Sequence, residues 1–191
     1  MRKVFIDGGA HGGQSIRRFV ETCPDATEYE VHSFEPNPYF KEKILGYQKV
    51  FNVHYHPKAL WVEDGTIDFF GTDEIDKSKY CGCTVTEEKQ DVSHAEPITV
   101  ECINLGQWIK KTFSKEDKIY LKLDIEGAEY KVLNSMIDNG SIFYPDKLFV
   151  EFHHQWMEMD PQIHFDLQKR LKENNIEVQF WDALGSFVPK Y

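Results

Sequence analysis

Two spacings of apolar residues alternate along this chain. Short apolar runs predict buried strands, and stretches with apolar residues three and four positions apart predict helices. The first strand is the run Val4-Phe5-Ile6, which ends at Asp7 before a glycine-rich turn. The predicted strands are residues 3–7, 30–35, 50–56, 66–70, 98–104, 118–125 and 148–152, with 177–181 and 187–189 as a terminal hairpin. The predicted helices are residues 13–22, 38–46, 105–113, 128–139 and 161–174.

Alternating strands and helices predict an α/β fold, in which a doubly wound, mostly parallel sheet carries helices on both faces. The terminal hairpin would place one antiparallel strand at an edge of this sheet. A chain of 191 residues suits a single domain spanning residues 1–191. Residues 71–95 are polar and rich in turn formers, and a loop of that length inside a compact domain is usually functional. We interpret it as a lid over the site.

Ligands of such sheets bind beyond the carboxyl ends of the strands, near the point where the strand order reverses. The glycine-rich turn at residues 7–13 lies at such an end. No register of its glycines supplies the first, third and sixth positions of a dinucleotide fingerprint, which disfavours an NAD-dependent dehydrogenase. An acid before the glycines suits the ammonium of a zwitterionic ligand and repels a pyrophosphate. These features favour S-adenosylmethionine as the cofactor, with a plain strand-to-helix turn as the alternative.

A second signal for a nucleoside is Glu35, which follows the next strand, one strand-helix-strand unit after Asp7. Parallel strands bring such ends to one edge of the sheet, where a carboxylate accepts hydrogen bonds from a ribose diol. The sequence therefore predicts Glu35 as the ribose ligand.

Charged residues interrupt the buried strand at 118–125. Lys122, Asp124 and Glu126 are spaced two apart, so they project to one side near the end of the strand. These charged residues are interpreted as part of a functional site, and the alternative is a buried ion pair without a function. Glu151 and His153 follow the next strand. We expect His153 or Asp124 to act as general base, with Lys122 and Glu126 orienting the base or the substrate.

Metal sites are less favoured. Asp124, Glu151 and His153 together form a minority hypothesis for a divalent cation. His54 and His56 share one strand face, but no nearby sequence supplies a third ligand for zinc. The Cys81-Gly82-Cys83 sequence lacks the two-residue spacer of a zinc knuckle.

The formal net charge of −10 argues against a nucleic-acid partner, because phosphate contacts need clustered Lys and Arg. No apolar stretch approaches the roughly 20 residues that span a bilayer, and the first strand leaves no room for a signal peptide. We therefore expect no membrane partner, a cytoplasmic location and reduced cysteines. Oligomeric state has no signature in the sequence.

Three motifs in order resemble the FkbM family of S-adenosylmethionine-dependent methyltransferases. They are the turn at 5–13, Phe34-Glu35-Pro36-Asn37-Pro38 and the segment Leu121 to Glu129, supported by Lys58-Ala59-Leu60 and Glu151-x-His153. The resemblance implies a class I methyltransferase fold in which Asp7, Gly9 and Gly13 line the methionine end, Glu35 holds the ribose and Ala59 lies near the adenine. It also implies O-methylation of hydroxyls on sugars or small natural products. His11 replaces the usual asparagine of the turn, and we hypothesise that it still donates a hydrogen bond there.

Together, these inferences predict an O-methyltransferase with a small-molecule or carbohydrate acceptor. A non-catalytic nucleoside-binding protein is the alternative from another class. The predicted cofactor-binding residues are Asp7, Gly9, Ala10, His11, Gly13, Ser15, Glu35, Pro36, Asn37, Ala59 and Asp124.

Overall fold

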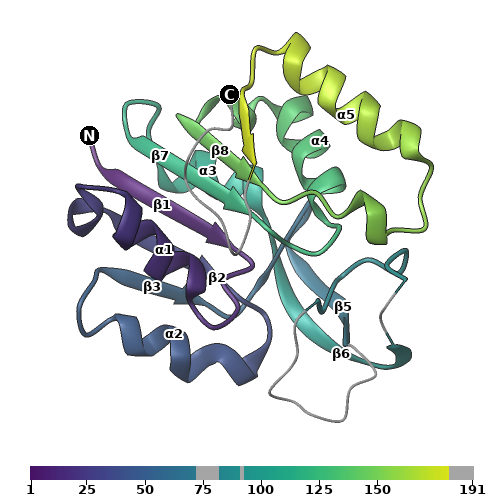
Figure 1. Cartoon of the computed structure of the whole chain (residues 1–191), viewed down its shortest axis with the longest axis horizontal. Coiled ribbons are helices and arrows are strands. Elements are labelled where there is room, and N and C mark those ends of the chain that lie inside the picture. Colours follow the sequence, from purple (N-terminus) through teal and green to yellow (C-terminus); the bar gives the residue numbers. More distant parts are fainter. Residues whose placement is uncertain (72–81, 91–92, 181–191) are drawn as a thin grey trace.

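A computed structural model of the chain describes residues 1–71, 82–90 and 93–180. Its main element is a six-stranded sheet with the order β3-β2-β1-β7-β8-β9, in which every neighbouring pair is parallel (Figure 1). The predicted doubly wound parallel sheet is confirmed. Its strands are β1 (Lys3–Gly8), β2 (Glu30–Phe34), β3 (Val53–His56), β7 (Lys118–Leu123), β8 (Lys147–Val150) and β9 (Val178–Phe180).

Helices cover both faces of the sheet because successive strand residues point to opposite sides. In β1, Val4 and Ile6 face one core and Phe5 faces the other, where its ring stacks on Phe19 with centroids 4.2 Å apart. The first core packs against α3 (Leu105–Thr112), α4 (Glu129–Asn139) and α5 (Pro161–Glu173). The second packs against α1 (Gln14–Thr22) and α2 (Lys41–Tyr47). Short 3-10 turns are η1 (Ala26–Glu28), η2 (Pro38–Phe40), η4 (Ser141–Phe143) and η5 (His154–Trp156).

A second, smaller sheet lies beside the first and was not predicted as a separate layer (Figure 1). It consists of β4 (Ala59–Trp61), β5 (Gly65–Gly71) and β6 (Ser93–Asn104), with β6 in the middle. β5 and β6 pair antiparallel, whereas β4 and β6 pair parallel. A small core that contains Phe69, Val100 and Ala128 joins this sheet to the start of α4. Periodicity reveals strands but not their partners, so only the tertiary structure separates the two sheets.

Several predicted boundaries differ from the structure. The predicted helix 38–46 begins as the 3-10 turn η2, and the predicted strand 50–56 begins only at Val53, because the amides of Val50 and Phe51 bond to the carbonyl of Tyr47. The hairpin partner at 187–189 lies outside the described residues, as do 72–81 and 91–92 of the predicted lid. None of the helices in the described ranges combines the length and apolar character needed to cross a bilayer.

Candidate functional site

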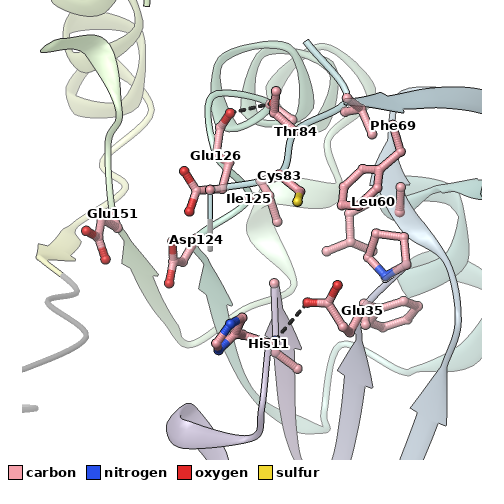
Figure 2. Close-up of a pocket in the computed structure, with 18 of the residues that line it drawn as sticks. His11, Glu35, Leu60, Phe69, Cys83, Thr84, Asp124, Ile125, Glu126 and Glu151 are labelled. Atoms are coloured by element: carbon pink, nitrogen blue, oxygen red, sulfur yellow. Dashed lines mark hydrogen bonds between the residues drawn. The ribbon is translucent and has the colours of Figure 1, made fainter. Parts of the chain in front are cut away.

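A cavity of about 350 Å³ lies at the carboxyl ends of the main strands. Residues that follow β1, β2, β7 and β8 line it, and the strand order reverses between β1 and β7. This is the switch point at which doubly wound folds bind ligands. Figure 2 shows Glu35, Leu60 and Phe69 on one side of the cavity, with Asp124, Glu126 and Glu151 on the other.

The glycines of the turn after β1 allow the chain to pack against itself. Gly9 has φ +74°, and a Cβ there would lie 1.8 Å from the carbonyl oxygen of Asp124. Gly13 has φ +87°, and a Cβ there would lie 2.4 Å from the Tyr47 ring. The family resemblance implied that both glycines line the methionine end of the cofactor. Gly9 does line the cavity, but a side chain at this position is excluded by the backbone of Asp124, which follows β7. At Gly13 the closely packed group is the ring of Tyr47.

Glu35 is held rigidly at the end of β2. Its Oε2 accepts a hydrogen bond from the amide of His11 at 2.8 Å, and its Oε1 accepts one from the amide of Asn37 at 2.8 Å (Figure 2). Burial raises the pKa of this carboxyl to about 7, although the two amides oppose that shift. Each oxygen retains a lone pair, so the carboxylate can accept further donors from a ligand.

A buried cation lies beneath the glycine turn. Lys122 Nζ lies 3.3 Å from Asp7 Oδ1 and 3.3 Å from Asp124 Oδ2, and it donates to the carbonyls of Gly8 and Gly9. Burial opposes the charge on this ammonium, but Asp124 and Asp7 outweigh it and raise the pKa of Lys122. The ammonium therefore joins β1, β7 and the turn through one charged centre.

Asp7 is fully buried and bonds within the protein. Its Oδ2 accepts a hydrogen bond from Ser15 Oγ at 2.6 Å, and its other oxygen faces Lys122. Asp7 therefore positions the start of α1 and the cation from behind the cavity wall.

His153 lies among three carboxylates. Its Nδ1 is 3.2 Å from Glu129 Oε1, and its Nε2 is 3.4 Å from Glu126 Oε2 and 3.7 Å from Asp124 Oδ1. Burial of the ring lowers its pKa, but the bond to Glu129 and the three negative charges raise the pKa to about 9. An imidazole that is already protonated at neutral pH donates hydrogen bonds and accepts no proton.

Glu151, two residues before His153, has a carboxyl group with a raised pKa. Burial, followed by the charge of Asp124, raises the pKa of Glu151 to about 7. The side chain is half-buried and lines the cavity. It is thus a group at the rim that exchanges a proton near neutral pH.

The segment 82–90, part of the predicted lid, is tied to the cavity. Thr84 Oγ1 donates to the carbonyl of Glu126 at 2.6 Å (Figure 2), and Thr84 pairs with Phe70 at the end of β5. Lys89 Nζ lies 2.8 Å from Glu126 Oε2 and 2.6 Å from the carbonyl of Gly82. These bonds fix the described part of the segment as one wall of the cavity.

Most predicted site residues meet at the cavity. Those that line it are Gly9, Ala10, His11, Ser15, Glu35, Pro36, Ala59, Lys122, Asp124, Glu126 and His153. Predicted cofactor ligands that lie outside this lining are Asp7, Gly13 and Asn37. The side-chain oxygen of Asn37 accepts a hydrogen bond from the amide of Tyr39 and so begins the turn η2. The ring of His11 has Nδ1 3.2 Å from Gln14 Oε1, so it contacts the start of α1.

Several lining residues were not predicted. They include Phe69, Thr84 and Val85, while Phe34, Lys58, Leu60 and Ile125 appeared only within the family motifs and Glu151 was predicted only as a possible metal ligand. Phe69 lies on β5, and Thr84 and Val85 lie in the segment between β5 and β6. No spacing in the sequence shows that a second sheet would complete the cavity.

Within residues 1–71, 82–90 and 93–180, two groups of side chains have donor atoms close enough to share a metal ion. In the cavity, one donor atom each from Asp124, Glu126 and His153 lie within 4.8 Å of one another. Glu126 takes the place that we predicted for Glu151. Lys89 and Lys122 already lie within 3.3 Å of these carboxylates and neutralise part of their charge. The second group lies on β2 and β3 and consists of Glu30, His32 and His54.

Comparison with known proteins bears on this site. The family model of the methyltransferase FkbM domain matches residues 7–177, which include every lining residue. Searches of curated proteins and of solved structures returned no match.

Proposed function

Since the chain belongs to the FkbM methyltransferase family, we propose that it transfers a methyl group from S-adenosylmethionine to a hydroxyl group of a sugar or another small molecule. The choice of S-adenosylmethionine as the methyl donor rests on Glu35. This carboxylate at the end of β2 keeps lone pairs that can accept hydrogen bonds from a ribose diol. Its neighbours in the cavity suit the rest of that donor.

The residues present fit S-adenosylmethionine. Leu60 and Phe69 supply an apolar wall on the same side of the cavity as Glu35, which suits an adenine ring. Asp124 lies across the cavity, where a carboxylate attracts an ammonium or a sulfonium. When bound, the donor supplies a methyl group on a positively charged sulfur.

The remaining acidic side chains define the acceptor side. Glu126 and Glu151 lie on the same side of the cavity as Asp124, opposite the apolar wall (Figure 2). Carboxylates accept hydrogen bonds from hydroxyl groups and so orient a polyol toward the donor. Holding the hydroxyl in line with the methyl group supplies a large part of the rate, because it converts a bimolecular reaction into an oriented one.

Glu151 is the proton acceptor in this proposal. We expected His153 or Asp124 in that role, but the carboxylates around His153 keep its ring protonated. Asp124 is already engaged by the ammonium of Lys122 at 3.3 Å, so we assign it to holding that cation. A carboxyl group with a pKa of about 7 is matched to accepting a proton at neutral pH.

Titration calorimetry with S-adenosylmethionine and S-adenosylhomocysteine tests the donor. We expect binding of both, and about 10-fold weaker binding by Glu35→Gln, because an amide replaces a charged acceptor. The exposed Glu42→Gln on α2 is the matched control and should bind like the parent. Absence of binding at about 1 mM, an affinity of −4.1 kcal/mol, would overturn the proposed donor.

Release of S-adenosylhomocysteine in the presence of hydroxylated acceptors tests catalysis. Sugars, nucleotide sugars and phenols are supplied separately, together with the corresponding amines. Turnover with a hydroxyl acceptor supports the proposal, whereas turnover with amines alone would show N-methylation. Tight binding of the donor without turnover on any acceptor would favour the non-catalytic alternative.

A further inference from the structure

Three histidines, none of which lines the cavity, gather on one face of β2 and β3. In the parallel register His32 lies opposite His54 and Phe34 lies opposite His56, so these side chains share a face. The ring of His32 stacks on His54 with centroids 4.8 Å apart and on His56 at 5.2 Å. β3 is the edge strand of the main sheet (Figure 1), so the group lies at one edge of that sheet.

A carboxylate completes this group. Glu30 precedes His32 by two residues on the same strand, and its Oε1 lies 2.8 Å from His32 Nε2 and 3.7 Å from His54 Nε2. One donor atom from each of Glu30, His32 and His54 lie within 4.8 Å of one another. The sequence showed only the pair His54 and His56, and the missing ligands come from the neighbouring strand.

We propose that Glu30, His32 and His54 bind one divalent transition-metal ion of the borderline class, with zinc as its representative. Zinc binds imidazole nitrogen and carboxylate oxygen at about 2.0–2.2 Å, so two of its bonds span at most about 4.2 Å. The donor atoms therefore need only a small shift. His54 is free to make it because 46% of its side chain is exposed. Solvent supplies the remaining coordination position.

Hydrogen bonds to neighbouring side chains already orient the proposed metal ligands His32 and Glu30. His56 Nε2 lies 3.0 Å from His32 Nδ1, which leaves Nε2 of His32 for the ion. Arg2 donates hydrogen bonds to both oxygens of Glu30, with its Nη2 2.8 Å from each. With Oε1 on the ion, Oε2 stays bonded to Arg2. Such outer partners fix ring orientation and carboxylate position at metal sites.

The proposed ion would link the edge strand to its neighbour without touching the cavity. Glu30 and Glu35 lie at opposite ends of β2, which separates them by about 16 Å of extended chain. Glu30 is paired with one cation, the guanidinium of Arg2 at 2.8 Å, whereas two ammonium groups, those of Lys89 and Lys122, lie among the carboxylates of the cavity. Metal binding should therefore raise the unfolding temperature and leave the affinity for S-adenosylmethionine unchanged.

Titration of the metal-stripped protein with zinc chloride at pH 7.5 tests the proposal. We expect one high-affinity ion per chain and a higher unfolding temperature, with no such effect of Mg²⁺, which prefers oxygen ligands. His54→Ala and Glu30→Gln should each weaken zinc binding by at least about 10-fold. The exposed His154→Ala is the matched control and should bind zinc as the parent does. Circular dichroism establishes that each variant is folded.

The competing results are distinct. Unaltered zinc affinity in both site variants, or no stoichiometric binding, would overturn the proposal. Loss of binding in His153→Ala with full binding in His54→Ala would place the ion in the cavity and also overturn it. Co²⁺ provides a second measurement, since an intense sulfur-to-metal band in the near ultraviolet would show cysteine ligands instead of imidazole and carboxylate.

Discussion

His153 and Glu129 form a buried contact in which Nδ1 of the imidazole lies 3.2 Å from Oε1 of the carboxylate. The same carboxylate accepts hydrogen bonds from the amides of Ile125 and Gly127, so it also shapes the turn that carries Glu126. A ring fixed in this way is part of the scaffold that positions the acidic side of the cavity. This contact changes the role expected of His153 from a base to a protonated donor.

The first prediction concerns stability at alkaline pH. The folded-state pKa of His153 is about 9, above its ordinary value of 6.5, so its stabilisation is complete below pH 6.5 and is lost as the pH rises through 9. The free energy of unfolding should fall by about 2 kcal/mol between pH 7.5 and 9.5. Urea unfolding at both values measures this. His153→Gln should flatten the dependence, while the exposed His154→Gln should keep it; an equal slope in all three proteins would contradict the assignment.

The second prediction concerns the buried cation. Lys122→Met leaves Asp7 buried without its ammonium, which should cost about 3–5 kcal/mol of stability. Adding Asp7→Asn removes the uncompensated charge and should recover at least about 1 kcal/mol. Chemical denaturation of both variants measures the coupling. Lys169→Met, on an exposed part of α5, should change stability by less than about 0.5 kcal/mol. Additive losses in the double variant would refute a direct pairing.

The third prediction is a pH dependence of cofactor binding. Glu35 has a pKa of about 7 in the ligand-free protein, and hydrogen bonds from the hydroxyl groups of a ribose favour the charged form of its carboxyl group. Binding then requires loss of a proton at low pH, so the affinity for S-adenosylmethionine should be about 10-fold lower at pH 6 than on the plateau above pH 8. Calorimetry across this range measures it. Glu35→Gln should bind weakly with no such dependence, and a parent affinity that is constant from pH 6 to 8 would argue against Glu35 as the ribose ligand.

The fourth prediction concerns catalysis. If Glu151 accepts the proton, kcat should rise with pH through about 7, because only the carboxylate form is active. Glu151→Gln should lower kcat by about 100-fold and leave the dissociation constant of S-adenosylmethionine within about twofold. Steady-state kinetics combined with calorimetry separates the two effects. The exposed Glu158→Gln serves as control, and full turnover by Glu151→Gln would exclude this base.

The fifth prediction compares two glycines. Gly9→Ala places a Cβ 1.8 Å from the Asp124 carbonyl oxygen at φ +74°, so it should cost at least about 3 kcal/mol. Gly46 lies in α2 with nothing within 4 Å of an added Cβ, so Gly46→Ala should stabilise the protein by about 0.5–1 kcal/mol. Thermal unfolding of both variants measures the contrast. A mild effect at Gly9 would contradict the close approach of β7.

Local signals predicted most of the parallel sheet. The apolar runs at Val4 to Ile6 and at Ile119 to Leu123 became β1 and β7, because a strand covered by helices on both faces must be apolar throughout. The helix predicted at 128–139 ends at that boundary as α4, since Gly140, with φ +75°, has no side chain to oppose that conformation. Glu35 was found at the end of its strand because parallel strands bring their carboxyl ends to one edge.

Other features depended on contacts between segments distant in the sequence. The protonation of His153 follows from Glu126, Glu129 and Asp124, and a single histidine in a sequence carries no trace of them. Phe69 and Thr84 reached the cavity only because a second sheet formed beside the first. Likewise, the ligands that join His54 come from β2 across the strand pairing. The sequence by itself determined which segments become strands and which turn opens the site, because those depend on local periodicity and backbone freedom. Only the tertiary structure decided the charge of each group and its neighbours, because burial and ion pairing are properties of the assembled sheets.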